Sequence, residues 1–174
     1  SDGVILPTLP GAPRDGVESS GDGQRDSGND PSVLIVEDNP SNRMVYRACL
    51  AKENYRIREA PNGEAALAAI AQDPPAVIIM DIRMPVMNGL ECTRRLKADP
   101  QTRDIPVIIV SARSDARDVL SGLDAGADEY LTKPIRTTEL VVRVRSMVRW
   151  SRERQDLLRS YRLRAEQIRI LSIM

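Results

Sequence analysis

Between residues 32 and 142, short apolar runs alternate with amphipathic patterns. Apolar runs with few polar residues are typical of strands that are buried on both faces of a sheet. Helical patterns separate these runs, and Pro, Asn or Gly residues mark the ends of several of them. The alternation predicts an α/β domain with a doubly wound, five-stranded parallel sheet and helices on both faces.

The individual elements follow from the same pattern. The expected strands are Val33–Val36, Tyr55–Ala60, Ala76–Met80, Val107–Val110 and Glu129–Leu131. The expected helices run from Pro40 to about Lys52, over Glu64–Ala71, 90–98 and Asp115–Ala125, and onward from Thr137. The second strand is more polar than the others, so we expect it near an edge of the sheet.

Polar side chains stand where the apolar runs end. Glu37 and Asp38 follow the first strand, Asp81 ends the third, Ser111 follows the fourth, and Lys133 follows the fifth. Because the carboxyl ends of parallel strands share one rim, where ligands bind in such sheets, we expect these side chains to meet. Three carboxylates in one cleft repel each other unless a cation lies among them, and an all-oxygen site suits Mg²⁺, with Mn²⁺ as a substitute. Together with Lys133 and Ser111, the cluster predicts phosphoryl transfer to Asp81 as the nucleophile.

Each of these residues, taken alone, has a plainer interpretation. An aspartate at a strand end commonly caps a helix, and an isolated lysine is commonly a solvated charge. Ser111 could simply satisfy a strand end, and Tyr130 could be a half-buried sheet residue. The convergence of four strand ends on one chemistry favours the functional interpretation. Other nucleotide-binding motifs, GxxxxGK[ST] and GxGxxG after the first strand, do not occur in the sequence.

Four segments carry a resemblance to a known family. The segments "VLIVEDNPSNRMV", "VIIMDIRMPVMNGLE", "PVIIVSA" and "GADEYLTKPI" resemble, in order and spacing, the signature segments of bacterial response-regulator receiver domains. The resemblance covers about residues 32–150 and implies a flavodoxin-like fold. It implies that a partner histidine kinase or phosphotransfer protein phosphorylates Asp81, and that the domain is a cytoplasmic signalling module rather than an enzyme.

The resemblance also implies roles for individual residues. Mg²⁺ would be bound by Glu37, Asp38, Asp81 and the backbone carbonyl of Arg83. Lys133 would pair with the phosphoryl group and precede a cis bond to Pro134, and Ser111 and Tyr130 would form a switch pair. Arg83 and Arg113 would flank the rim and influence hydrolysis of the acyl phosphate. Many family members have Asp where this chain has Glu37.

The remaining parts of the chain differ in character. Residues 1–31 contain six of the ten glycines, four prolines and no apolar period, so we expect a disordered tail or linker. We expect the receiver domain over 32–149 and a helical extension over 150–174 toward an output domain. Cys49 and Cys92 each stand alone in an amphipathic pattern, which favours buried thiols over a disulfide or metal site. No apolar run is long enough to predict a membrane span.

The extension has a heptad pattern. With Met147 at an a position, the a and d residues are Met147, Trp150, Arg154, Leu157, Tyr161, Arg164, Ile168 and Leu171. Six of these eight are apolar, which predicts a two-stranded coiled coil and a parallel homodimer through residues 141–174. Nine arginines lie between residues 143 and 174. An exposed helix face explains them better than nucleic-acid binding, because no helix-turn-helix pattern follows.

Two function classes remain open from the sequence. The first is a phosphorylation-dependent switch that relays a change through its C-terminal helix. The second is a receiver-like scaffold that dimerises without being phosphorylated. The intact set of acids with Ser111 and Lys133 favours the switch. An independent aspartate-nucleophile phosphatase is disfavoured, because no segment supplies a substrate-covering cap.

Overall fold

The computed structural model describes residues 29–113 and 116–174. The predicted N-terminal tail, 1–31, therefore lies outside the described residues except for its last three. Asp115, expected at the start of the fourth helix, also lies outside them.

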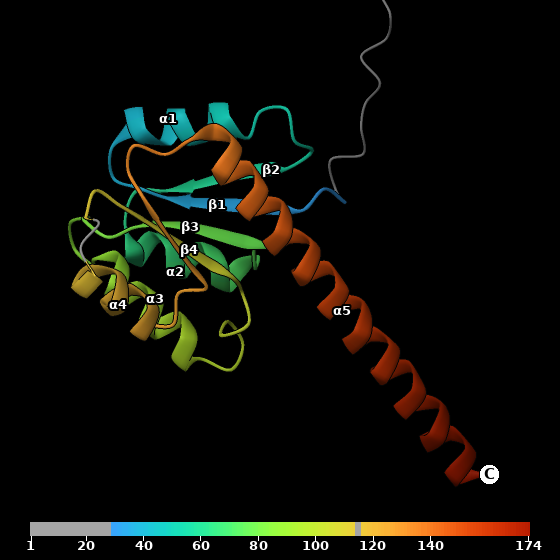
Figure 1. Ribbon diagram of the computed structural model, residues 1–174. Coiled ribbons are helices and arrows are strands. Elements are labelled where there is room, and N and C mark those ends of the chain that lie inside the picture. The colour runs from blue at the N-terminus through green and yellow to red at the C-terminus, as the bar shows by residue number, and fades with distance from the viewer. Residues whose placement is uncertain (1–28, 114–115) are drawn as a thin grey trace, which may run out of the picture.

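A parallel sheet of five strands forms the centre of the domain (Figure 1). Its strands are β1 (Ser32–Val36), β2 (Arg56–Ala60), β3 (Val77–Asp81), β4 (Val107–Ser111) and β5 (Glu129–Thr132). They lie in the order β2-β1-β3-β4-β5, and every neighbouring pair is parallel. All residues of β1, β3 and β4 are buried, as expected for central strands covered on both faces. The predicted α/β class and strand number are confirmed.

Helices cover both faces of this sheet (Figure 1). They are α1 (Pro40–Cys49), α2 (Gly63–Gln72), α3 (Gly89–Ala98), α4 (Ala116–Asp124) and α5 (Thr137–Ile173). Helices α2 and α3 pack with Leu34, Ile78 and Ile109 in one apolar core. Helices α1 and α5 pack with Val33, Ile79 and Ile108 in the other. Alternate strand residues thus serve opposite cores, which is why the strands are apolar without interruption.

The end of the first helix differs slightly from expectation, whereas the position of the second strand agrees with it. Helix α1 ends at Cys49 rather than near Lys52. After it, the amide of Ala51 bonds to the carbonyl of Ala48, and the amide of Glu53 bonds to that of Leu50, so the last turn tightens into three-residue steps. Strand β2 lies at the sheet edge, as predicted from its polar residues.

Helix α5 contains 37 residues and runs without a break through the predicted boundary at 149/150 (Figure 1). At 1.5 Å per residue it is about 55 Å long, so its C-terminal part projects away from the sheet. Among the described residues, no helix is both long enough and apolar enough to cross a bilayer. Both cysteines are free thiols; Cys92 is buried as expected, whereas Cys49 is only half buried.

Candidate functional site

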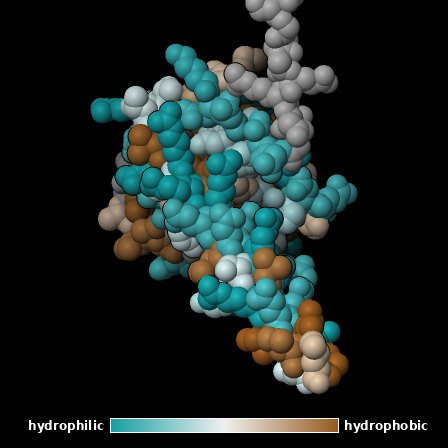
Figure 2. Space-filling model, turned by 90° about the vertical axis from the view of Figure 1, so that its right-hand side faces the viewer, coloured by the Kyte–Doolittle hydropathy of each residue, from teal (hydrophilic) through white to brown (hydrophobic). Residues whose placement is uncertain are grey.

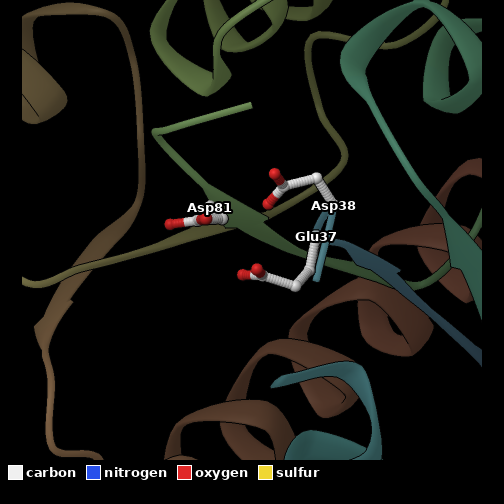
Figure 3. A group of neighbouring side chains, drawn as sticks. All are labelled: Glu37, Asp38 and Asp81. Atoms are coloured by element: carbon white, nitrogen blue, oxygen red, sulfur yellow. The ribbon is translucent and has the colours of Figure 1, made fainter. Parts of the chain in front are cut away.

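Three carboxylates meet at the carboxyl-terminal edge of the sheet. Glu37 and Asp38 directly follow β1, and Asp81 is the last residue of the adjacent strand β3. Ligand oxygens of the three side chains lie within 4.8 Å of one another, and the carboxylates face the same space (Figure 3). Glu37 and Asp81 are buried, whereas Asp38 is exposed. One open side and three oxygen donors make this cluster a suitable site for a hard divalent cation.

The N-terminus of α1 holds the Glu37 side chain in place. Its Oε1 accepts hydrogen bonds from the Asn39 amide at 3.2 Å and from Asn42 Nδ2 at 3.0 Å. Its Oε2 is buried and has no hydrogen-bond partner among the described residues. The Lys133 Nζ atom lies 3.8 Å from that oxygen. A buried carboxylate oxygen without a donor is costly, so a cation bound among the three acids would stabilise the site.

Two further residues support the acidic pair, and neither was identified from the sequence. Asn42 binds the Glu37 carboxylate, and Arg43 donates from Nη1 to the carbonyl oxygens of Glu37 (2.7 Å) and Asp38 (3.2 Å). Asn39 caps α1 and Pro40 occupies its first turn, so the helix begins directly after Glu37 and Asp38. Its first turn therefore places Asn42 and Arg43 beside these two residues. The capping signal is visible in the sequence and could have identified Asn42 and Arg43 as neighbours of the acids.

The structure brings Lys133 and Ser111 to the same edge. The Lys133 Nζ atom lies 3.7 Å from Asp81 Oδ1, which also accepts a hydrogen bond from the Ile82 amide at 3.0 Å. Ser111 ends β4 next to Asp81, and its carbonyl accepts a bond from the Lys133 amide at 2.8 Å. The peptide bond between Lys133 and Pro134 is cis. The Lys133 ammonium thus lies close to both buried carboxylates, Asp81 and Glu37.

Ser111 and Tyr130 are both bonded to the backbone of Arg113. The Ser111 hydroxyl oxygen accepts from the Arg113 amide at 3.1 Å, and the Tyr130 hydroxyl donates to the Arg113 carbonyl at 2.8 Å. The Tyr130 ring packs over Gly122 of α4, where an added Cβ would lie 2.6 Å from the ring. The serine and the tyrosine are therefore linked through one short loop.

A cleft of about 540 Å³ opens beside the acids. Its lining includes Asp38, Arg83, Met84, Arg113 and Asp118. Arg113 Nη1 lies 3.5 Å from Asp118 Oδ1, and Arg83 is exposed on the rim. The cleft therefore places Arg83, Arg113 and Asp118 on the same side of the sheet edge as Asp38.

The loop after Asp81 turns sharply and returns to it. Val86 has φ of 69°, and the Met87 amide bonds to the Pro85 carbonyl at 2.8 Å, so Val86 lies at the centre of a γ-turn. The Gly89 amide then bonds to the Ile82 carbonyl at 2.9 Å. A Cβ on Gly89 would lie 2.0 Å from the Asp81 carbonyl oxygen. The start of α3 can approach the end of β3 this closely only with glycine at position 89.

Burial raises the pKa of Glu37 to about 7; the hydrogen bond from Asn42 opposes this rise, and Asp81 adds to it. A raised carboxyl pKa means that the folded state binds the proton more tightly than the unfolded chain does. Without divalent cations, the free energy of unfolding should therefore fall as the pH rises from the usual glutamate pKa to about 7. The slope should be at most about 1.4 kcal/mol per pH unit, which is the limit for one proton.

This pH dependence can be measured by thermal melting in chelator. The wild type should melt at a higher temperature at about pH 5.5 than at about pH 8, and Glu37→Gln should reduce the difference. Glu64→Gln, on the exposed first turn of α2, is the matched control. An equal pH dependence in wild type and Glu37→Gln would contradict the assignment.

Comparison with known proteins gives a family match. The sequence profile of the response regulator receiver domain matches residues 33–145. Response regulator PleD of Caulobacter vibrioides is 42% identical over 118 residues, which cover 68% of this chain and 26% of PleD. Response regulator MprA of Mycobacterium avium is 36% identical over 124 residues, which cover 71% of this chain and 54% of MprA. The chain thus spans about half or less of the length of these relatives.

Solved structures agree in fold. The receiver domain of the sensor histidine kinase PA1611 from Pseudomonas aeruginosa, with magnesium coordinated in its active-site cleft, has a TM-score of 0.62 and 34% identity. That match covers 70% of this chain and 98% of that one. The receiver domain of the Francisella response regulator 1452 has a TM-score of 0.65 and 30% identity, with 70% and 99% covered.

Proposed function

The chain belongs to the response regulator receiver domain family, and from this membership we propose that it is a signalling switch controlled by phosphorylation of Asp81. The phosphoryl donor is the phosphohistidine of a partner histidine kinase or phosphotransfer protein. The observation that carries the proposal is the setting of Asp81: Lys133 Nζ lies 3.7 Å from its Oδ1, and the carboxylates of Glu37 and Asp38 are close by.

The residues of the site divide the chemistry among them. A carboxylate oxygen of Asp81 attacks the phosphorus, an O–P bond forms as the P–N bond of the donor breaks, and the imidazole leaves. Lys133 neutralises charge on the phosphoryl group, and the Ser111 hydroxyl donates to one of its oxygens. Glu37, Asp38, Asp81 and the backbone carbonyl of Arg83 would hold Mg²⁺ there. The ion supplies charge neutralisation between the carboxylates and the incoming phosphoryl group.

The switch step follows from the shared contacts of Ser111 and Tyr130. When the Ser111 hydroxyl turns to the phosphoryl group, the Arg113 amide loses its acceptor and the loop that carries Arg113 rearranges. The Tyr130 hydroxyl donates to the carbonyl of Arg113, so the Tyr130 ring loses this contact when the loop that carries Arg113 moves. This coupling would change the surface of α4, β5 and α5.

The phosphorylation itself is testable with a small donor. Incubation with acetyl phosphate and Mg²⁺ should add one phosphoryl group per chain in intact-mass analysis, and chelation of Mg²⁺ should prevent it. Borohydride reduction should then place the modification at Asp81. An unlabelled protein that still dimerises would instead support the scaffold function.

Binding of Mg²⁺ should stabilise the fold, because it relieves the repulsion among three clustered carboxylates. At a free concentration a hundredfold above its dissociation constant, the gain in unfolding free energy should be about 2.7 kcal/mol. Asp38→Ala should abolish this gain, whereas Asp124→Ala, on the surface of α4, should retain it. A wild-type melting temperature that does not respond to millimolar Mg²⁺ would rule out this site.

The C-terminal half of α5 supports a second part of the proposal, a parallel homodimer through residues 141–174. Large apolar side chains beyond residue 156 are exposed in the single chain, and brown side chains gather at the far end of the helix in Figure 2. They include Leu157, Tyr161, Ile168 and Leu171 of the heptad pattern, which are 57–72% exposed. A second copy of the chain, with the same stripe, would cover them.

Paired substitutions test this dimer. Leu157→Glu with Ile168→Glu removes two core residues per helix, each worth ~1.5–3 kcal/mol of burial, so the dimer should weaken at least about 100-fold. Leu163→Glu with Ile170→Glu changes residues of similar exposure at the outer c positions and should have little effect. Sedimentation equilibrium measures the dimer dissociation constant of both variants. The measurement is made with and without beryllofluoride, which mimics the phosphoryl group. Equal weakening of the dimer by the two pairs would exclude a seam between the helices, that is, a contact through the a and d residues of the heptad pattern.

A further inference from the structure

Helix α5 remains attached to the receiver beyond residue 145, where the family match ends. The Ser151 hydroxyl donates to the Ala76 carbonyl at 2.7 Å. One turn later, the Arg154 guanidinium pairs with Asp104 in the loop before β4. The same guanidinium lies over the Trp150 ring, with its carbon 5.7 Å from the ring centroid. The helix is therefore held against the receiver through Arg154.

The residues that hold α5 and the residues of the heptad stripe lie on different sides of the helix. Leu140, Val144, Val148 and Ser151 are buried against the receiver. At 3.6 residues per turn, the a and d positions are centred roughly 120° away from that face. Trp150 is 45% exposed on the stripe, and Arg154 lies at its receiver-side margin. Two helices can thus meet along the stripe beginning at Trp150 without displacing either receiver.

Arginine at an a position is unfavourable unless its charge is compensated. In a parallel pair of helices, the two Arg154 side chains occupy facing positions and repel each other. Asp104 of the same chain supplies the opposite charge, and the hydrogen bond from Arg154 lowers the pKa of Asp104. The Arg154 guanidinium also lies over the Trp150 ring, which is a favourable cation–π arrangement.

We propose that Asp104, although it belongs to the receiver, is a residue of the dimer interface: by neutralising Arg154 it lets the two-helix seam begin at Trp150, at the edge of the receiver. This inference rests on the proposed dimer and adds the position where the seam starts. Because α5 is fixed through Arg154, no free helical segment then separates the receiver from the seam. A change in receiver orientation passes directly into the helix pair.

A double-mutant cycle on the full chain tests this role. Asp104→Asn should raise the dimer dissociation constant about tenfold. The substitution removes the Asp104–Arg154 ion pair from each chain, so the two facing arginines repel each other without compensation. Arg154→Leu should strengthen the dimer, and Asp104→Asn should have no effect in the Arg154→Leu background. Asp124→Asn removes the same charge from another face of the receiver and serves as the control. Sedimentation equilibrium gives the dissociation constants.

The fluorescence of Trp150 gives an independent measurement, because it is the only tryptophan in the sequence. Its fluorescence should shift to shorter wavelength as the protein concentration is raised through the dimer transition. A dimer with unchanged Trp150 emission and no response to Asp104→Asn would overturn the inference and leave the dimer standing. Equal weakening by Asp104→Asn with and without Arg154 would also overturn it. A chain that stays monomeric at every concentration would overturn the dimer and the inference together.

Discussion

The Asp81→Asn variant is expected to take up no phosphoryl group from acetyl phosphate or from a phosphorylated partner. An amide is not a useful nucleophile, so the labelling rate should fall by several orders of magnitude. The substitution preserves the side-chain shape and retains an oxygen that can accept the Ile82 amide, which now bonds Asp81 Oδ1 at 3.0 Å. The fold should therefore survive the change. Intact-mass analysis over time measures the effect.

Two control variants make this test specific. Asp124→Asn makes the same change in net charge at the exposed end of α4 and should be labelled at the wild-type rate. Asp38→Asn keeps Asp81 but removes one of the carboxylates proposed to bind Mg²⁺, so its labelling should be slow and should need more Mg²⁺. Labelling of Asp81→Asn to the wild-type level would show that another residue is the acceptor.

Gly89→Ala is expected to destabilise the protein by about 3 kcal/mol, at the upper end of the usual cost of overpacking. The added Cβ would meet the Asp81 carbonyl oxygen at 2.0 Å and its carbonyl carbon at 2.8 Å. Both are backbone atoms, so no side-chain rotation can relieve the contact. Either α3 or the end of β3 must move, and a movement of β3 displaces Asp81, the proposed phosphoacceptor. The phosphorylation rate should fall together with the stability.

Gly63 provides a matched control for this substitution. It also begins a helix after an asparagine cap, but its added Cβ would meet only side-chain atoms, the flexible Met87 side chain at 3.0 Å and the Cys92 Cβ at 3.1 Å. Gly63→Ala should consequently cost much less than Gly89→Ala in chemical denaturation. Equal losses of stability in the two variants would mean that replacing glycine by alanine is costly at the first position of any helix. The contact with the Asp81 carbonyl would then not be the cause.

The sequence contains enough information to predict the sheet and the edge where the site forms. Continuous apolar runs predict buried parallel strands, and the ends of parallel strands necessarily share one edge. That geometry brings Glu37 and Lys133 together although they are distant in the chain. The end of α1 is less predictable, because the change to three-residue steps after Cys49 depends on local hydrogen bonds.

Contacts that depend on the relative placement of elements were not predictable. Asn88 and Gly89 are typical of the opening of a helix, but only the structure reveals that Gly89 faces the Asp81 carbonyl. The heptad pattern places Arg154 at a core position, where it looks like a weakness of the seam. Its pairing with Asp104 requires the position of the loop before β4, which no local pattern specifies.

The unbroken course of α5 would have a consequence for any domain joined to its C-terminal end. A continuous helix transmits rotation, and each added residue turns its far end by about 100°. Insertion of seven residues after Leu157 would restore the original angular phase to within about 20°, whereas insertion of two would reverse it. A domain joined to this helix would receive the state of the receiver as a rotation angle. The number of residues in the helix would then matter only through the angle that remains after whole turns.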